Sequence, residues 1–423
     1  MNKRQQSLPG PDDITRVSLP NGITVMVRAN FNSPSVVIGG HLSSGSLFDS
    51  DEKLGVADFT ALGLMRGTET RPFQKIFDEL ESAGANLSYG AGAHNTGFSG
   101  RSLSEDLPLI LTLLANTLRH PIFPPEEIER LRAQFMTSLA QRAEDTADMA
   151  SITFDQIVFE GHPYARPEDG WPETIRAIQR DDLANFHRRC YGPRGMVIAL
   201  VGAVDPKNAV EAVAKVLGDW SNPEQLETPA LPPVKPIKKT VTRKVKIPGK
   251  SQADLVIGAS GPYRKDPDYI ADTLGNSALG QFGLGGRIGD VVREKSGLAY
   301  YASSTLNAGI GPGSWSVSAG VNPANIQKAR DLICREIGLF VEKGITAEEL
   351  ADSQSNFIGR LPLSLESNSG VANALLNIER YDLGMDYYRR YPDLVRAVTP
   401  EQILSAVRKY LDPERLAIAV AGP

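Results

Sequence analysis

The sequence has 423 residues, of which 41% are hydrophobic and 22% charged, and its formal net charge is −5. A chain of this length and composition is expected to form two globular domains of roughly 200 residues each. The slightly acidic balance and the scattered Lys and Arg residues argue against nucleic acid as a partner and against an anionic membrane surface.

The N-terminal segment MNKRQQSLPGPDDITRV has basic residues at its start but no apolar run after them, so it lacks the pattern of a secretory signal. No later segment is apolar enough to span a bilayer. We therefore expect no membrane association and a soluble, cytoplasmic protein, or a periplasmic one if a signal has been removed. The two cysteines, Cys190 and Cys334, cannot form a disulfide framework and are predicted to be free thiols.

The first half begins with strand patterns. Apolar residues alternate on both sides of Asn21-Gly22, which predicts a β-hairpin. A strand is expected over 35–43, followed by a helix over 55–66 that ends at Gly67. The segment 85–101, ANLSYGAGAHNTGFSGR, is rich in Gly, Ser and Asn and is expected to form two loosely patterned strands. Further helices are predicted over 73–83, 107–118, 125–142, 150–160 and 181–190, and a buried strand over 195–201.

The second half repeats the first. Residues 176–202 align with 396–422 without a gap, and seven of these 27 positions are identical. A period this long indicates a duplicated domain rather than a solenoid. Between the halves the sequence SNPEQLETPALPPVKPIKK contains five prolines, which predicts an extended linker. We therefore expect a first domain over 1–222, a linker over 223–239 and a second domain over 240–423.

Strand and helix patterns are mixed within each half, and the segments between strands differ in length. This favours an α+β fold of two homologous domains, each a mainly antiparallel sheet with helices packed on one face. The glycine-rich run over 280–286, GQFGLGG, lacks the Lys and Ser/Thr of a phosphate-binding loop and is expected to be a flexible turn.

The segment 285–301, GGRIGDVVREKSGLAYY, is the best candidate for a functional site. We predict a helix over 287–295 that ends at Gly297 and is followed by a strand over 298–305. Arg293 would then lie in the last helical turn and Tyr300 at the start of the strand, so that a guanidinium and a phenol could point into one space. The alternative is that Arg293 is a surface cation and Tyr300 an amphipathic packing residue.

Three segments carry a resemblance to a known family: HPYARP (162–167), GVADFTALGLMRGT (55–68) and REKSGLAYYASS (293–304). Together with the duplication, they resemble the M16 zinc peptidases, which include pitrilysin and the mitochondrial processing peptidase, and specifically their short two-domain subunits. The resemblance covers essentially the whole chain. It implies the metallopeptidase-like fold of one half of an M16 clamshell.

In active members of that family an H-x-x-E-H helix and a distant Glu bind zinc. Carried onto this sequence, the first His falls on Asp58, the base Glu on Ala61, the second His on Leu62 and the distant Glu on Leu139. None of these four residue types supplies the chemistry of the position it occupies. The five histidines show no metal-ligand spacing either: they are His41, His94, His120, His162 and His187. We therefore predict no metal in this chain.

In heterodimeric members one subunit supplies zinc and its partner supplies an Arg/Tyr pair, which Arg293 and Tyr300 match. The resemblance thus implies a zinc-less subunit that completes the active site of a zinc-bearing H-x-x-E-H partner for the hydrolysis of peptides. One alternative is a non-catalytic peptide-binding or structural protein, a homodimer or a complex component, in which 85–100 accepts an extended peptide as an added strand. A hydrolase with a Ser or Cys nucleophile has little support, because the sequence lacks such a motif.

Overall fold

The structure is a computed structural model that describes residues 8–282 and 285–423. Contacts between Cα atoms divide the chain into two compact units, and each unit is assembled from three segments. Unit 1 contains 1–139, 167–230 and 361–390, whereas unit 2 contains 140–166, 231–360 and 391–423. The units therefore do not coincide with the contiguous domains 1–222 and 240–423 expected from the sequence.

Unit 1 is built on a six-stranded sheet in the order β1-β2-β6-β3-β5-β4. Only β2 and β6 pair in parallel, and the other neighbours are antiparallel. The strands are β1 (Thr15–Ser18), β2 (Thr24–Ala29), β3 (Ser35–Leu42), β4 (Asn86–Ala91), β5 (Thr96–Leu103) and β6 (Val197–Gly202). The helices are α1 (Val56–Gly63), α2 (Phe73–Ser82), α3 (Leu107–Arg119), α4 (Pro125–Glu144), α6 (Pro172–Ala177), α7 (Arg180–Cys190), α8 (Pro206–Leu217) and α12 (Asn368–Tyr381), of which α4 runs across a unit boundary.

Unit 2 is built on a five-stranded sheet in the order β7-β11-β8-β10-β9, in which only β7 and β11 are parallel. Its strands are β7 (Val241–Lys246), β8 (Ala253–Ser260), β9 (Ala299–Leu306), β10 (Ser314–Val321) and β11 (Ala417–Gly422). Its helices are α5 (Thr146–Val158), α9 (Tyr269–Asn276), α10 (Ile326–Lys343), α11 (Ala347–Ser364), α13 (Tyr387–Arg396) and α14 (Pro400–Tyr410), of which α11 and α13 run across a unit boundary. This order repeats β2-β6-β3-β5-β4 of unit 1, which confirms the α+β fold and the internal duplication.

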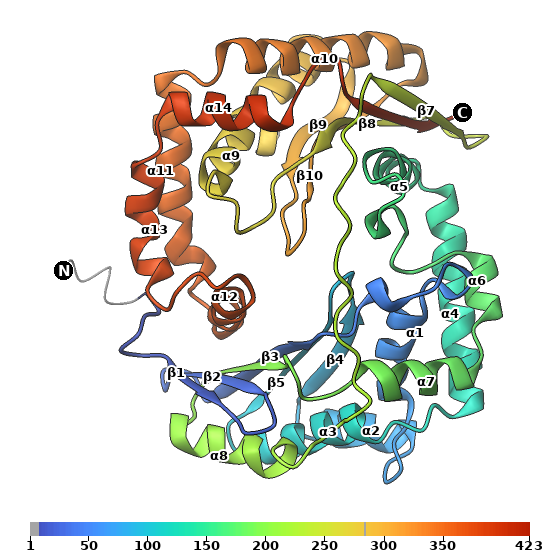
Figure 1. The fold of residues 1–423 in the computed structure, drawn as a ribbon, viewed down its shortest axis with the longest axis vertical. Helices are drawn as coiled ribbons and strands as arrows, with labels where there is room; N and C mark the ends of the chain where they lie inside the picture. The colour runs from blue at the N-terminus through green and yellow to red at the C-terminus, as the bar shows by residue number, and fades with distance from the viewer. Residues whose placement is uncertain (1–7, 283–284) are drawn as a thin grey trace. The chain divides into compact units, whose positions relative to one another are not determined.

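One face of each sheet packs on several helices, and a single helix covers part of the other face. In unit 1 this helix is α12, which contacts β6 and β3; in unit 2 it is α5, which contacts β11 and β8. Figure 1 shows both helices nearly end-on beside their sheets. Strand residues that alternate between the two faces make this possible, since Val36 and Ile38 enter the main core while Val37 packs with α12.

Each covering helix comes from the opposite half of the sequence. Helix α5 precedes the linker but packs in unit 2, and α12 lies in the second half but packs in unit 1. The linker over 223–239 has no regular secondary structure in its described residues. Local sequence patterns specify that these segments are amphipathic helices but not which sheet they will cover, which is why the contiguous boundaries differ from the compact units.

Several local expectations are confirmed. The helix predicted over 55–66 is α1 followed by a 3₁₀ turn at Leu64–Arg66, and Gly67 ends it with φ of 147°. Cys190 and Cys334 are free, and burial raises the pKa of the Cys190 thiol to about 12, so it is unreactive at neutral pH.

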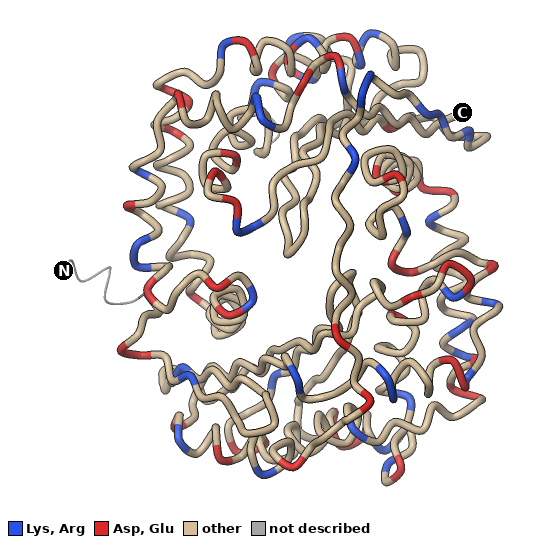
Figure 2. The backbone as a smooth tube through the Cα atoms, viewed as in Figure 1, with Lys and Arg blue, Asp and Glu red and all other residues tan. Residues whose placement is uncertain are grey.

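The glycine-rich run 280–286 lies partly outside the described residues. Acidic and basic residues are interspersed along both units (Figure 2), and none of the helices in the described ranges is long and apolar enough to cross a bilayer.

Candidate functional site

Asp58 lies in the first turn of α1, and its carboxylate is used within the fold. Its Oδ1 accepts a hydrogen bond of 3.2 Å from the backbone N–H of Ala91 at the end of β4. Burial raises the pKa of Asp58 to about 6, and the negative charge of Asp169 contributes in the same direction. A second carboxylate, Asp49, accepts hydrogen bonds from the N–H groups of Gly55 and Ala57 and so caps the same helix. Asp58 therefore anchors a strand terminus.

The other three positions that the family resemblance singled out are apolar and packed. Ala61 is completely buried, Leu139 on α4 is 2% exposed, and Leu62 packs against the same core from its edge. The rings of Phe59 on α1 and Phe135 on α4 lie 5.0 Å apart between centroids. Hydrophobic contacts therefore connect α1 to α4 at the positions that the family resemblance singled out.

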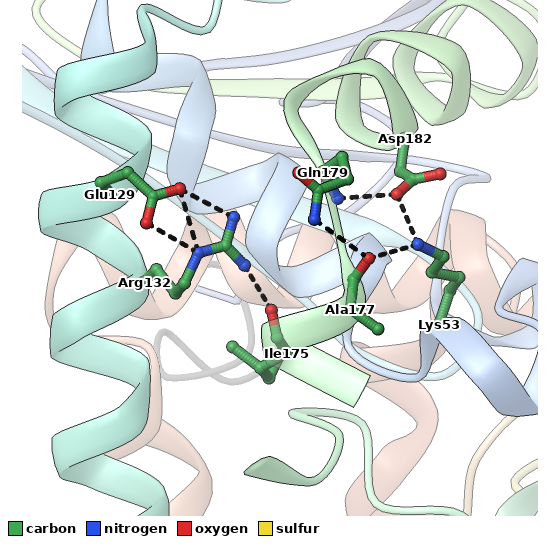
Figure 3. A network of polar contacts seen from close by, with 7 residues as sticks. All are labelled: Lys53, Glu129, Arg132, Ile175, Ala177, Gln179 and Asp182. Carbon is green, nitrogen blue, oxygen red and sulfur yellow. Dashed lines mark hydrogen bonds and ion pairs between the residues drawn. The ribbon is translucent and has the colours of Figure 1, made fainter. Parts of the chain in front are cut away.

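Polar contacts around these helices are also structural (Figure 3). The guanidinium of Arg132 on α4 lies 5.3 Å from the centroid of the Phe59 ring and donates to the carboxylate of Glu129 and to the carbonyl of Ile175. Nearby, the ammonium of Lys53 donates to the carbonyl of Ala177 and to Asp182 at 2.7 Å. These contacts hold α6 and the start of α7 against α4 and the 3₁₀ turn Asp51–Lys53.

The donor set at these positions does not fit zinc. Three protein ligands are the minimum for a catalytic zinc site, whereas α1 and α4 offer one carboxylate there, already bonded to a backbone N–H. Across the described ranges, no group of three or more His, Cys, Asp or Glu side chains is arranged to hold a metal ion. His41 is buried and His187 partly buried, and this desolvation lowers their pKa values to about 3 and about 4, so both are neutral.

Arg293 occupies the end of a π-helix, Gly289–Glu294, which is shorter than the helix predicted over 287–295. Gly297 adopts φ of 60°, and its N–H donates to the carbonyl of Arg293 at 2.9 Å, which closes the turn. The Arg293 side chain is 45% exposed, and among the described residues its ionic neighbour is Glu294 at 4.0 Å. The guanidinium is therefore available to a ligand.

Tyr300 lies on β9, the edge strand of the second sheet, at an irregularity in its pairing. Gly320 of β10 pairs with Tyr301 and Val321 pairs with Ala299, so Tyr300 is the extra residue of a β-bulge. Its side chain is 62% exposed, and its hydroxyl has no hydrogen-bond partner among the described residues. Bulges re-aim side chains at sheet edges and occur often beside active sites. The bulge was not predicted, because it depends on the pairing register.

The neighbouring tyrosine has the opposite character. The hydroxyl of Tyr301 donates to Oδ1 of Asp254 at 2.5 Å, and Asp254 is 1% exposed. Thr146 of α5 and Gln252 donate to the same carboxylate. The Arg293 and Tyr300 side chains are both exposed on unit 2, and no hydrogen bond joins them in the described residues. Of the two adjacent tyrosines, only Tyr300 is free to act on a ligand.

Sequence reasoning did not identify a groove on the sheet of unit 1. The groove has a volume of about 790 Å³ and lies between α12 and the exposed faces of β3, β5 and β4. Its floor includes Gly90 and Gly97, and two arginines, Arg101 and Arg380, line it. The Gly- and Ser-rich composition over 85–101 is the sequence signal for it, and from this composition we predict strand pairing and, in the alternative function, addition of a peptide as a strand.

The family assignment follows from comparison with known proteins. Residues 24–167 match the family model described as insulinase (peptidase family M16), and residues 177–357 match the peptidase M16 inactive domain. The chain belongs to peptidase family M16.

Individual relatives agree with this assignment over nearly the whole chain. An uncharacterised zinc protease of Streptomyces coelicolor is 25% identical over 98% of this chain and 90% of its own length. A probable beta subunit of the mitochondrial processing peptidase of Arabidopsis thaliana is 24% identical over 97% of this chain and 78% of its own. A crystal structure from Pseudomonas fluorescens, described as a peptidase M16 inactive domain, has a TM-score of 0.90 at 26% identity and covers 97% of this chain and 98% of its own.

Proposed function

We propose that this chain is the zinc-less subunit of a heterodimeric M16 peptidase and that it contributes Arg293 and Tyr300 to an active site whose zinc is bound by the partner. The observation that supports this most is the contrast between the two candidate regions. Ala61 and Leu139 are buried in the core, Leu62 packs against it and Asp58 is hydrogen-bonded to Ala91. By contrast, the side chains of Arg293 and Tyr300 are exposed and have no hydrogen-bond partners in the described fold. The plant relative is itself named as a subunit.

The two side chains have complementary chemistry for peptide hydrolysis. The planar guanidinium of Arg293 can donate two parallel hydrogen bonds to a carbonyl or carboxylate of an extended substrate. The hydroxyl of Tyr300 can donate to the oxyanion that develops at the attacked carbonyl, an interaction that becomes stronger as negative charge accumulates. Zinc in the partner would supply the activated water and Lewis-acid chemistry.

The test is to co-produce the chain with an M16 protein that carries H-x-x-E-H and to follow cleavage of a quenched fluorescent peptide. We expect neither chain alone to cleave it and the mixture to do so, with stoichiometric zinc only when the partner is present. Because one oxyanion donor contributes on the order of 100-fold to kcat, Tyr300→Phe should reduce kcat by about that factor, and Arg293→Ala should raise KM as well.

Matched controls exist in the same unit. Tyr263 is 44% exposed and Arg335 is an exposed residue of α10, and neither belongs to the candidate site. Tyr263→Phe and Arg335→Ala should leave hydrolysis by the complex unchanged. Wild-type rates in both Tyr300→Phe and Arg293→Ala, or zinc-dependent cleavage by this chain alone, would contradict the proposal.

A second candidate function is peptide binding without catalysis, and the edge of β4 favours it. Ala91 directs its N–H away from β5, to Asp58, and alternate residues of an antiparallel strand direct their N–H groups to the same side. The N–H groups of Leu87 and Tyr89 therefore face outward, and neither has a partner among the described residues. An extended peptide could add there as a strand. Tight binding of a peptide that stays intact in the presence of zinc and of the partner would favour this function.

A further inference from the structure

Two glycines in the groove of unit 1 have no structural reason to be glycine. Both Gly90 and Gly97 have negative or extended φ, since neither is among the residues with positive φ. A Cβ on Gly90 would meet nothing within 4 Å, and one on Gly97 would have only carbonyl oxygens at 3.8 and 3.9 Å. By contrast, a Cβ on the strand neighbour Gly100 would come within 2.8 Å of Ile110.

Glycine inside a strand weakens it by roughly 0.5–1 kcal/mol relative to a residue with a side chain, so unexplained glycines indicate a close approach by a ligand or another backbone. The residues beside them are also small, and the hydroxyls of Ser88 and Ser99 lie 3.0 Å apart on the same face. The floor of the groove is therefore bare backbone and small polar groups. Such a surface is suited to an extended chain rather than to a bulky side chain.

The charge of the groove has one sign. Among the described residues that line it there is no Asp or Glu, whereas Arg101 and Arg380 are both present. Arg101 is exposed and has no partner in the described structure. Arg380 donates only a long hydrogen bond, 3.4 Å, to Asn95, and its Nε is buried without a partner. The adjacent His41 is neutral, because burial and the charge of Arg380 lower its pKa to about 3.

The two guanidinium groups belong to opposite ends of the floor. Arg101 is opposite Val37 at one end of the lining run 97–101 of β5, while Arg380 contacts Asn95, just before the other end. Four residues of extended chain span about 13 Å, and residues i and i+4 of an extended peptide face the same side. We infer that this groove binds an extended acidic peptide whose two carboxylate side chains, four residues apart, pair with Arg101 and Arg380.

All residues that line this site belong to unit 1, whereas Arg293 and Tyr300 belong to unit 2. Binding by the purified full-length chain therefore tests the site independently of hydrolysis. The probe is a fluorescein-labelled peptide of about nine residues of Ser and Thr with Glu at two positions four apart, compared with the same peptide carrying Gln. In anisotropy titrations the Glu peptide should bind at least about tenfold more tightly than the Gln peptide, because Gln cannot form charge-assisted hydrogen bonds with the two arginines.

Variants locate the binding. Arg101→Gln should weaken binding of the Glu peptide about tenfold and leave the Gln peptide unaffected. Gly97→Val should abolish binding without lowering the melting temperature, because the added side chain enters open space and raises strand propensity, and Gly97→Ala should have an intermediate effect. Arg176→Gln, which changes an exposed arginine of α6 outside the groove, is the matched control and should bind like the wild type.

Three results would overturn the inference. They are equal affinity for the Glu and Gln peptides, full binding by Gly97→Val with its fold intact, and displacement of the peptide by free glutamate at the same concentration. The last result would identify a site for a small anion in place of a peptide.

Discussion

The helix pair α1–α4 of unit 1 and the turn from the π-helix into β9 of unit 2 differ in what the fold requires of them. At the first, Ala61 and Leu139 are buried in a continuous apolar core, and the carboxylate of Asp58 holds the end of β4. At the second, the side chains of Arg293 and Tyr300 are exposed and have no hydrogen-bond partner among the described residues. Burial therefore distinguishes side chains that stabilise the fold from side chains that are free to contact a ligand. Substitutions at the two regions should accordingly differ in their effect on the free energy of unfolding.

The largest effect is expected for an attempt to restore a zinc ligand. Leu139→Glu places a carboxylate in the apolar core between α1 and α4, and burial of an unpaired polar group should lower the free energy of unfolding by about 4 kcal/mol. Urea denaturation measures this change, and Leu139→Ala, which creates only a cavity, should lose about 3 kcal/mol. A Leu139→Glu protein as stable as the wild type would show that this region is not a packed core.

A smaller and pH-dependent effect is expected at Asp58. Its pKa in the folded protein is raised from 3.8 to about 6, so the folded state retains a proton that the unfolded state has lost between these two values. Stability therefore falls as pH rises from about 4 to about 6, by on the order of 2 kcal/mol.

Asp58→Asn keeps an oxygen that can accept a hydrogen bond from Ala91 but has no carboxyl group to ionise. The variant should therefore gain stability relative to the wild type as pH rises from about 4 to about 6. Comparing the two proteins at each pH cancels the contribution of groups with raised pKa values that do not interact with Asp58, such as Asp272. A stability difference between them that does not change from pH 4 to pH 7 would contradict the assigned burial of this carboxylate.

The adjacent tyrosines of β9 provide a sharper version of the comparison. Tyr301→Phe removes the donor to the buried carboxylate of Asp254 and should cost about 1–2 kcal/mol of stability. The loss should be detected as a lower urea midpoint with an unchanged slope. If Tyr301→Phe were as stable as the wild type, the remaining donors from Thr146 and Gln252 would be sufficient for Asp254.

The smallest effect is expected where the proposed function is located. Tyr300→Phe and Arg293→Ala should each change the free energy of unfolding by less than about 0.5 kcal/mol, as for exposed residues without structural contacts. The same urea measurements apply. A loss above about 1 kcal/mol in either variant would mean that the side chain has a structural role, and any loss of activity in the complex could then not be assigned to chemistry.

The motifs at 55–68, 162–167 and 293–304 carry the resemblance to the family. Strand alternation and helix periodicity predict the α+β class, and the 220-residue offset between 176–202 and 396–422 predicts the duplication, because these are local or linear patterns. The family is confirmed, and the sheet orders show the repeat directly. The paired strands expected over 85–101 are β4 and β5. The roles of Arg293 and Tyr300 remain predictions, as do the zinc-less state of the chain and its partnership.

Other features depend on contacts between distant segments and could not be predicted. The bulge at Tyr300 exists because Gly320 pairs with Tyr301 in a register that no local pattern specifies. The groove requires α12 to lie over strands that precede it by more than 250 residues, so Arg101 and Arg380 gave no sequence signal that they would line the same space. The packing of α5 and α12 on their sheets likewise depends on contacts between segments that are distant in the sequence.

The reciprocal placement of α5 and α12 also bears on how the protein can be divided. A break in the chain between residues 223 and 239 would not release two self-sufficient fragments, because the N-terminal piece would carry α5 without its sheet and would leave Val37 and Val201 of its own sheet uncovered. The C-terminal piece would have the converse deficiency. Two such fragments produced together are expected to bind each other through these helices. The linker is therefore a suitable site at which to divide the protein for split-protein complementation.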